Sequence, residues 1–158
     1  MWYFLEVESV ERLMKVSART EYAAIAAVEL ARQSDDDTPV RMRSICEVQQ
    51  IPARFLVQIL LQLNRAGIVK SVRGAGGGYR LARNPEDITL GEIRAAIEGP
   101  TGVPAPIAAG LSGESHVAAA LVSVWDQAAE AQATTLENVT LADLVHRSRG
   151  ISEPMYYI

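Results

Sequence analysis

A glycine-rich run near the middle of the chain restricts the fold more than any other feature. Residues 74–78 read Gly-Ala-Gly-Gly-Gly. Residues 68–73 before it alternate apolar and polar side chains like a half-buried strand, and residues 79–82 after it read as a second strand. Because glycine adopts the backbone angles of tight turns at little steric cost, the sequence predicts a β-hairpin over residues 68–82.

Three helices are predicted ahead of this hairpin. The first covers residues 16–34 and has Ser17 as its N-cap. The second is short and begins near Met42. A turn leads to the third, over residues 52–65, where Pro52 suits the first helical position. Two helices, a turn, a third helix and a hairpin, in this order, make a winged helix-turn-helix.

The rest of the chain is also predicted to be helical, so the fold class is mainly α with a small β-hairpin. Residues 89–98 form a short helix, residues 116–135 a long one, and residues 140–146 a closing one. We divide the chain into an N-terminal extension (1–13), a winged helix-turn-helix DNA-binding domain (14–98), a loop (99–115), and a dimerisation helix with a C-terminal tail (116–158).

Charge separates a basic part of the chain from an acidic part. The whole sequence has 15 Lys and Arg against 19 Asp and Glu. Residues 14–85 hold eleven of the basic residues and six acidic ones, whereas the residues from 86 onward hold three and ten. Such a division is expected when one part binds a polyanion. It also arises by chance or for solubility, so charge alone leaves the matter open.

Two stretches carry a resemblance to a known family. Residues 44–52 read Ser-Ile-Cys-Glu-Val-Gln-Gln-Ile-Pro, and residues 71–81 read Ser-Val-Arg-Gly-Ala-Gly-Gly-Gly-Tyr-Arg-Leu. They resemble the helix-turn-helix and the wing of the Rrf-two family of bacterial transcription regulators, and weaker matches extend the resemblance to residues 14–146. The resemblance implies a homodimer that binds double-stranded DNA, mostly as a repressor.

Nine residues are predicted to contact DNA. Arg54 and Gln58 lie one turn apart on the third helix, and from the major groove they can reach guanine and adenine respectively. A solvated helix face is the alternative for Gln58. Gly76 and Gly77 let the wing backbone approach the duplex closely. The cations predicted to neutralise phosphates are Arg41, Arg43, Lys70, Arg73 and Arg80.

The long helix at residues 116–135 is predicted to join two copies of the chain. Its apolar stripe consists of Val117, Leu121, Val124 and Ala128, with Trp125 beside it. The stripe could pack within its own chain, but a helix of about 30 Å is long for so small a domain. Two helix-turn-helix units must also be held about one DNA turn apart to read a palindrome, which favours dimerisation.

Cysteine content argues against a metal or cofactor. Many members of the resembled family hold an iron–sulfur cluster through three cysteines in the loop before the dimerisation helix. The loop at residues 99–115 contains none, and Cys46 is the only cysteine in the sequence. We therefore expect no metal and no cofactor, and we expect Cys46 to be a small core side chain. Control is then expected to come from a small-molecule effector at the dimer interface, from a partner protein, or from abundance alone.

Other function classes find little support. No Ser/His/Asp, Cys/His or paired-carboxylate frame is recognisable, and the glycine run matches neither standard phosphate-binding motif. No apolar run approaches a membrane span and no signal peptide is evident, which predicts a cytoplasmic protein without a membrane partner. The sequence thus predicts a dimeric, sequence-specific DNA-binding transcription regulator that acts as a repressor and is not an enzyme. The alternative is a winged-helix module that mediates protein–protein contacts and does not bind DNA.

Overall fold

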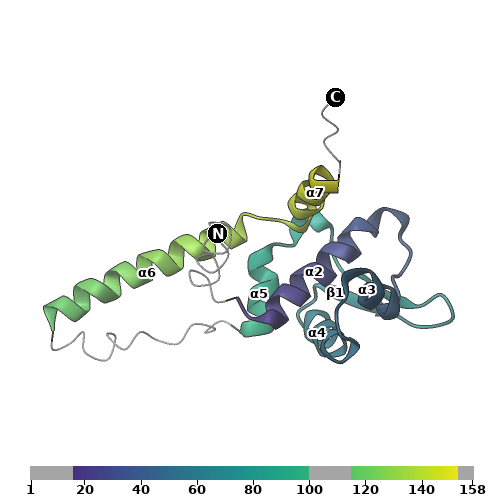
Figure 1. The fold of residues 1–158 in the computed structure, drawn as a ribbon, viewed down its shortest axis with the longest axis horizontal. Coiled ribbons are helices and arrows are strands. Elements are labelled where there is room, and N and C mark those ends of the chain that lie inside the picture. The colour runs from purple at the N-terminus through teal and green to yellow at the C-terminus, as the bar shows by residue number, and fades with distance from the viewer. Residues whose placement is uncertain (1–15, 100–114, 153–158) are drawn as a thin grey trace, which may run out of the picture.

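The computed structural model describes residues 16–99 and 115–152, and its elements follow the predicted order (Figure 1). The predicted fold class, mainly α with one hairpin, is confirmed. In chain order the elements are α2 (Ala18–Arg32), the 3-10 turn η1 (Ser34–Asp36), α3 (Met42–Gln49), α4 (Ala53–Arg65), β1 (Val69–Val72), β2 (Gly78–Leu81), the 3-10 turn η2 (Pro85–Asp87), α5 (Leu90–Glu98), α6 (His116–Glu137) and α7 (Leu141–Ser152).

Side-chain caps set where several helices begin. Ser17 is the N-cap of α2, as predicted, and its Oγ accepts a hydrogen bond from the backbone N–H of Thr20 at 3.2 Å. Thr89 caps α5 in a reciprocal capping box with Glu92. Pro52 is the N-cap of α4 rather than its first residue, because its ψ of 130° is extended. The predicted boundary was therefore one residue early.

The core lies where α2, α4 and α5 meet. Ala23, Ala26 and Ala27 of α2 are fully buried, and these small side chains let the neighbouring helices approach closely. The apolar face predicted for α4 is confirmed: its fully buried members are Leu56, Ile59, Leu60 and Leu63. Burying side chains of this size stabilises the fold by about 1.5–3 kcal/mol each. The core thus fixes the helix that the sequence singled out for DNA.

A buried carboxylate ties α3 to α2. Glu29 of α2 is 5% exposed. It accepts hydrogen bonds from Gln33 Nε2 at 2.8 Å and from Gln49 Nε2, at the end of α3, at 2.7 Å, and it pairs with Arg32. Gln50 follows with a left-handed φ of 55° and redirects the chain into α4. Since the carboxylate is satisfied by three donors, its burial holds the α3–α4 turn in place.

A second carboxylate joins the start of α2 to the end of α5. Glu98 accepts hydrogen bonds from Thr20 Oγ1 at 2.8 Å, Arg94 Nε at 3.1 Å and the backbone N–H of Ser17 at 3.4 Å. Burial raises the pKa of Glu98, but these bonds and the Arg94 charge outweigh it, and the pKa lies below its usual value. The carboxylate is therefore ionised at neutral pH and holds both helix ends.

The hairpin forms as predicted and gains a backbone partner. Strands β1 and β2 pair antiparallel, with Lys70 opposite Arg80. Val40 pairs with Tyr79 through two backbone hydrogen bonds of 2.8 Å each, which the sequence analysis did not anticipate. A Cβ at Gly78 would overlap the Val40 carbonyl group. Gly78 is therefore required for this close approach rather than for a positive φ.

Helix α7 returns onto the core, whereas α6 projects from it (Figure 1). Leu141 and Val145 of α7 belong to the same buried cluster as α2. Helix α7 extends to Ser152, beyond the predicted end at residue 146. Helix α7 thus shares the core of the winged helix, although it lies outside the domain predicted over residues 14–98. The predicted limits of the domains remain a prediction. No helix among the described residues combines the length and apolar character that a membrane span requires.

Candidate nucleic-acid interface

The exposed face of α4 is the most coherent candidate surface. Arg54, Gln58, Leu61 and Arg65 follow one another at intervals of four, three and four residues, and all are exposed. At 3.6 residues per turn they share one face, opposite the buried Leu56, Ile59, Leu60 and Leu63. Arg54 and Gln58 were predicted to contact DNA, whereas Leu61 and Arg65 were not, although their spacing can be read in the sequence. We call these four residues the α4 face.

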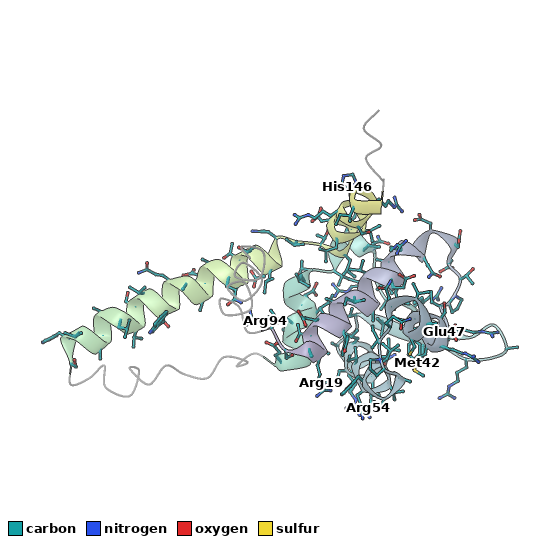
Figure 2. The ribbon with its side chains drawn as sticks, in the orientation of Figure 1. Arg19, Met42, Glu47, Arg54, Arg94 and His146 are labelled. Carbon is teal, nitrogen blue, oxygen red and sulfur yellow. The ribbon has the colours of Figure 1, made fainter. Side chains whose placement is uncertain are left out.

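Arg54 is held in place from below. Its guanidinium carbon lies 4.7 Å from the centre of the Phe55 ring, a cation–π contact. Phe55 in turn stacks on Tyr22 of α2 with ring centres 6.1 Å apart. Arg54 points away from the body of the protein (Figure 2). The guanidinium is thus presented outward from a rigid base and can donate two parallel hydrogen bonds.

Helix α4 is also fixed along its side. Arg19 of α2 donates a hydrogen bond from Nη2 to Gln62 Oε1 at 2.8 Å. Gln62 is half-buried and lies beside the α4 face rather than on it. Together with the core beneath, this contact restrains rotation of α4 about its axis. The direction in which the α4 face points is therefore set by the fold.

Arg41 and Arg43 flank the start of α3. Arg41 is the N-cap residue, and its Nη2 donates to the carbonyl oxygen of Ala75 in the wing at 3.1 Å. Arg43 is exposed and pairs with Glu47 one turn later, with Nε and Oε1 2.8 Å apart. The hydrogen bond and the charge of Glu47 raise the pKa of Arg43. Arg41 thus joins the helix-turn-helix to the wing, while Arg43 carries an exposed charge.

The wing tip consists of Arg73 and the glycines after it. Arg73 is exposed and has no ion pair within the described ranges 16–99 and 115–152. Gly76 has open space where a Cβ would lie, whereas a Cβ at Gly77 would collide with the carbonyl oxygen of Val72. Gly77 also closes the turn, its N–H donating to the Gly74 oxygen at 3.0 Å. The tip therefore offers a free cation on a slender turn.

Lys70 and Arg80 lie elsewhere on the wing. They are cross-strand partners, and because side chains alternate along a strand, they lie on the face opposite the buried Val69 and Leu81. Arg80 Nη1 forms an ion pair with Asp37. Both residues line a hollow together with α7. The nine predicted DNA-contacting residues thus divide between the α4 face, the α3 start and wing tip, and this outer wing face.

The stripe predicted for dimerisation is exposed on α6. Val117 is 81% exposed, Val124 56%, Trp125 49% and Leu121 44%. Ala128 is exposed as well. Figure 1 shows α6 running away from the α2–α5 body for most of its length. The described residues therefore leave this apolar surface uncovered, which is typical of a surface that meets another molecule.

The described residues do not bring together ligands for a metal cluster. Cys46 is half-buried in α3 and packs against the core, as predicted. Within the part of the chain that the structure describes, no group of three or more His, Cys, Asp or Glu could hold a metal ion. The loop residues 100–114, outside the described ranges, contain no cysteine. The donor set of this chain therefore does not fit a thiolate-bound iron–sulfur cluster.

Comparisons with known proteins match most of the chain. A family model described as Rrf2, iron-dependent transcriptional regulator, matches residues 16–147. The HTH-type transcriptional regulator CymR of Bacillus subtilis (strain 168) is 34% identical over 146 residues, 92% of this chain and 100% of CymR. The solved structure of B. subtilis CymR, titled the global cysteine regulator, superposes with a TM-score of 0.74 at 30% identity, covering 85% of this chain and 98% of that one. The structure of T. potens IscR superposes with a TM-score of 0.72 at 34% identity, covering 92% and 98%.

Proposed function

Since the chain belongs to the Rrf2 family of transcriptional regulators, we propose that it is a dimeric, sequence-specific DNA-binding regulator that acts as a repressor. Its relatives are transcription regulators, which are not enzymes. The observation that carries the proposal is the α4 face, where Arg54, Gln58 and Arg65 align outward on a helix fixed by the core. Because DNA is the proposed partner, we place its action in the cytoplasm.

In this proposal α4 enters the major groove. Arg54 is presented by Phe55 toward a guanine edge, where a guanidinium can donate to both O6 and N7. Gln58, one turn later, reaches an adjacent base. Leu61 offers an apolar contact of the kind that a thymine methyl group accepts. Arg65, at the end of the helix, pairs with a phosphate.

The wing tip and the start of α3 supply contacts that do not depend on sequence. Arg73 is free to neutralise a phosphate, and Gly76 lets the backbone come near the duplex. Arg41 connects this tip to α3 through its bond to Ala75. Arg43 can exchange its exposed partner Glu47 for a phosphate, because exposed ion pairs contribute little. These contacts fix the register in which α4 reads the groove.

Removing wing or α4-face side chains should have two different effects on DNA binding. Arg73→Ala should weaken binding to all duplexes and reduce the salt slope of log K by up to about one unit. Arg54→Ala or Gln58→Ala should relax preference at one position per half-site, at a cost of about 1–3 kcal/mol each. Fluorescence anisotropy titrations over a range of salt concentrations, with selected and random duplexes, measure both effects.

The matched control is Arg147→Ala, which removes the same charge from an exposed position on α7. Its salt slope should equal that of the unchanged protein. If Arg73→Ala behaves like Arg147→Ala throughout the titration, the wing tip has no part in DNA binding. If the unchanged protein shows no salt-dependent binding to any duplex, the alternative of a protein–protein module replaces the proposal.

We further propose that α6 forms the dimer with a second copy of the chain. No described residue covers the apolar stripe from Val117 to Ala128, and burying apolar surface stabilises association by about 25 cal/mol per Å² before the costs of association. A palindromic site requires both α4 faces on one side of the dimer, so the two-fold axis has to run across α6 rather than along it. Association through the stripe also removes apolar surface from water.

The family description includes iron dependence, yet the ligands of this chain do not fit a cluster, and we propose a regulator without one. The purified protein should be colourless, and its DNA binding should be indifferent to oxygen and iron chelators. Anaerobic purification from iron-replete cells, followed by an absorption spectrum and iron and sulfide assays, measures this. A brown protein with matching iron and sulfide would contradict it and would point to oxygen and nitrogen ligands such as Glu21 and His116.

A further inference from the structure

A hollow of about 750 Å³ lies between the base of the wing, the end of α2 and α7. Its volume is within the range of small-molecule sites, about 300–1,000 Å³. No described residue of α3 or α4 lines it. His146, which lines it from α7, and Arg54 of the α4 face lie on opposite sides of the body (Figure 2). The hollow is therefore distinct from the proposed DNA surface.

Cations stand on two sides of this hollow. Lys70 and Arg80 line it from the hairpin, and Arg149 lines it from α7. Arg83 also lines it, but its guanidinium is already bonded to Glu92 and to the Asp87 carbonyl oxygen. A ligand that reached both sides would meet Lys70 and Arg80 at one end and Arg149 at the other.

Several of these donors lack partners. The side chains of Lys70 and Arg149 make no hydrogen bond or ion pair with the described residues. Arg80 Nε is buried and has no hydrogen-bond partner, although Nη1 of the same side chain pairs with Asp37. A buried donor without an acceptor is costly, and native structures usually satisfy such groups with water or a ligand. The buried-donor argument applies to Arg80, whereas Lys70 and Arg149 are exposed and their charges are available to a ligand in the hollow.

The acidic residues at the rim do not prevent an anion from binding in the hollow. Asp37 pairs with Arg80, but its side chain is 85% exposed and its φ of 49° lies in the left-handed region that favours glycine. An ion pair so exposed contributes little, so a ligand anion can displace it from Arg80. Asp35 and Glu86 also line the hollow and are exposed, where water screens their charge.

We propose that this hollow binds a small metabolite that carries two anionic groups, phosphate or carboxylate. One group bonds to Lys70 and, by displacing Asp37, to the guanidinium of Arg80 on the hairpin, and the other bonds to Arg149 of α7. Such a ligand would connect the wing to α7 and recruit two cations that the sequence had assigned to DNA. The inference does not depend on DNA binding, because the site contains no part of the α4 face.

Isothermal titration of the full chain without DNA tests the proposal, with pyrophosphate and citrate as probes and sodium chloride at matched ionic strength. We expect saturable binding of at least one probe, and the stronger one identifies phosphate or carboxylate as the recognised group. Lys70→Gln and Arg149→Gln should each weaken that binding by about tenfold or more, because each removes a charge-assisted hydrogen bond. The matched control Arg147→Gln, on α7 but outside the hollow, should change it by less than about twofold.

Two outcomes would overturn the inference. One is the absence of saturable binding by either probe up to about 10 mM, a Kd too weak for a built site. The other is binding that survives Lys70→Gln and Arg149→Gln but is lost in Arg54→Ala, which would place the anion on the α4 face. Circular dichroism of each variant checks that these surface substitutions leave the fold intact.

Discussion

Replacing Leu121 with glutamate should convert the protein from a dimer into monomers and lower its affinity for a palindromic operator by more than about 100-fold. Leu121 lies within the apolar stripe of α6 and is 44% exposed in the single chain. In the proposed dimer a carboxylate at this position would be buried without a partner, which strongly opposes association. The loss of affinity follows because a monomer binds each half-site independently. Sedimentation velocity at micromolar concentration and operator titrations measure the two effects.

Ser123→Glu is the matched control for this substitution. Ser123 is exposed on the same helix, but its position two residues after Leu121 places it on the other side of α6. It introduces the same charge and should leave both the dimer and the operator affinity unchanged. A monomeric unchanged protein, or a dimer that tolerates Leu121→Glu, would show that α6 is not the dimer contact.

Replacing Gly78 with alanine should separate the wing from the core and lower the free energy of unfolding by about 2–3 kcal/mol. The new methyl group would occupy the space of the Val40 carbonyl, so the two backbone hydrogen bonds between Val40 and Tyr79 would have to open. Because β2 carries this bridge, the wing should lose its fixed position and affinity for all duplexes should fall. Urea denaturation and duplex titrations measure these changes.

Gly76→Ala, two residues away in the same hairpin, provides the comparison. A Cβ at Gly76 meets nothing within 4 Å, and its φ is not in the left-handed region. Its unfolding free energy should stay within about 0.5 kcal/mol of the unchanged protein. If Gly76→Ala lowers DNA affinity while stability is unchanged, the wing tip approaches the duplex closely. Equal stability of Gly78→Ala and Gly76→Ala would refute the role assigned to the Val40 contact.

The parts of the fold that were predictable are those that local patterns specify. Ser17 predicts the start of α2, because a hydroxyl at the N-cap accepts a hydrogen bond from a backbone N–H that has no partner within the helix. The buried face of α4 follows from apolar residues at helical spacing. The hairpin follows from alternation around a glycine run. Each of these signals lies within a few neighbouring residues.

The features that could not be predicted depend on contacts between distant segments. Val40 pairs with Tyr79 through the backbone alone, which leaves no pattern in the side chains. Lys70 and Arg80 alternate correctly along their strands, but only the packing of α7 shows what their face meets. Likewise, Glu29 looks like an exposed acidic residue of α2 in the sequence, and only the fold shows that Gln49 of α3 donates a hydrogen bond to it. Leu61 and Arg65 are different from these features: their helical spacing from Arg54 is visible in the sequence, so they could have been predicted.

The base of α6 is clamped by the backbone of its neighbours. The N–H of Leu90 donates to the Val139 oxygen at 2.8 Å, and the N–H of Leu141 donates to the Ile88 oxygen at 2.9 Å. Gly91 of α5 lies so close to Glu137 that an added Cβ would be 3.1 Å from its Cγ. In the proposed dimer, this rigid attachment of α6 fixes the distance and the angle between the two α4 faces. An extra base pair between operator half-sites rotates one half-site by about 35° relative to the other. Because these contacts hold the end of α6 rigidly, the dimer should not adjust to that rotation.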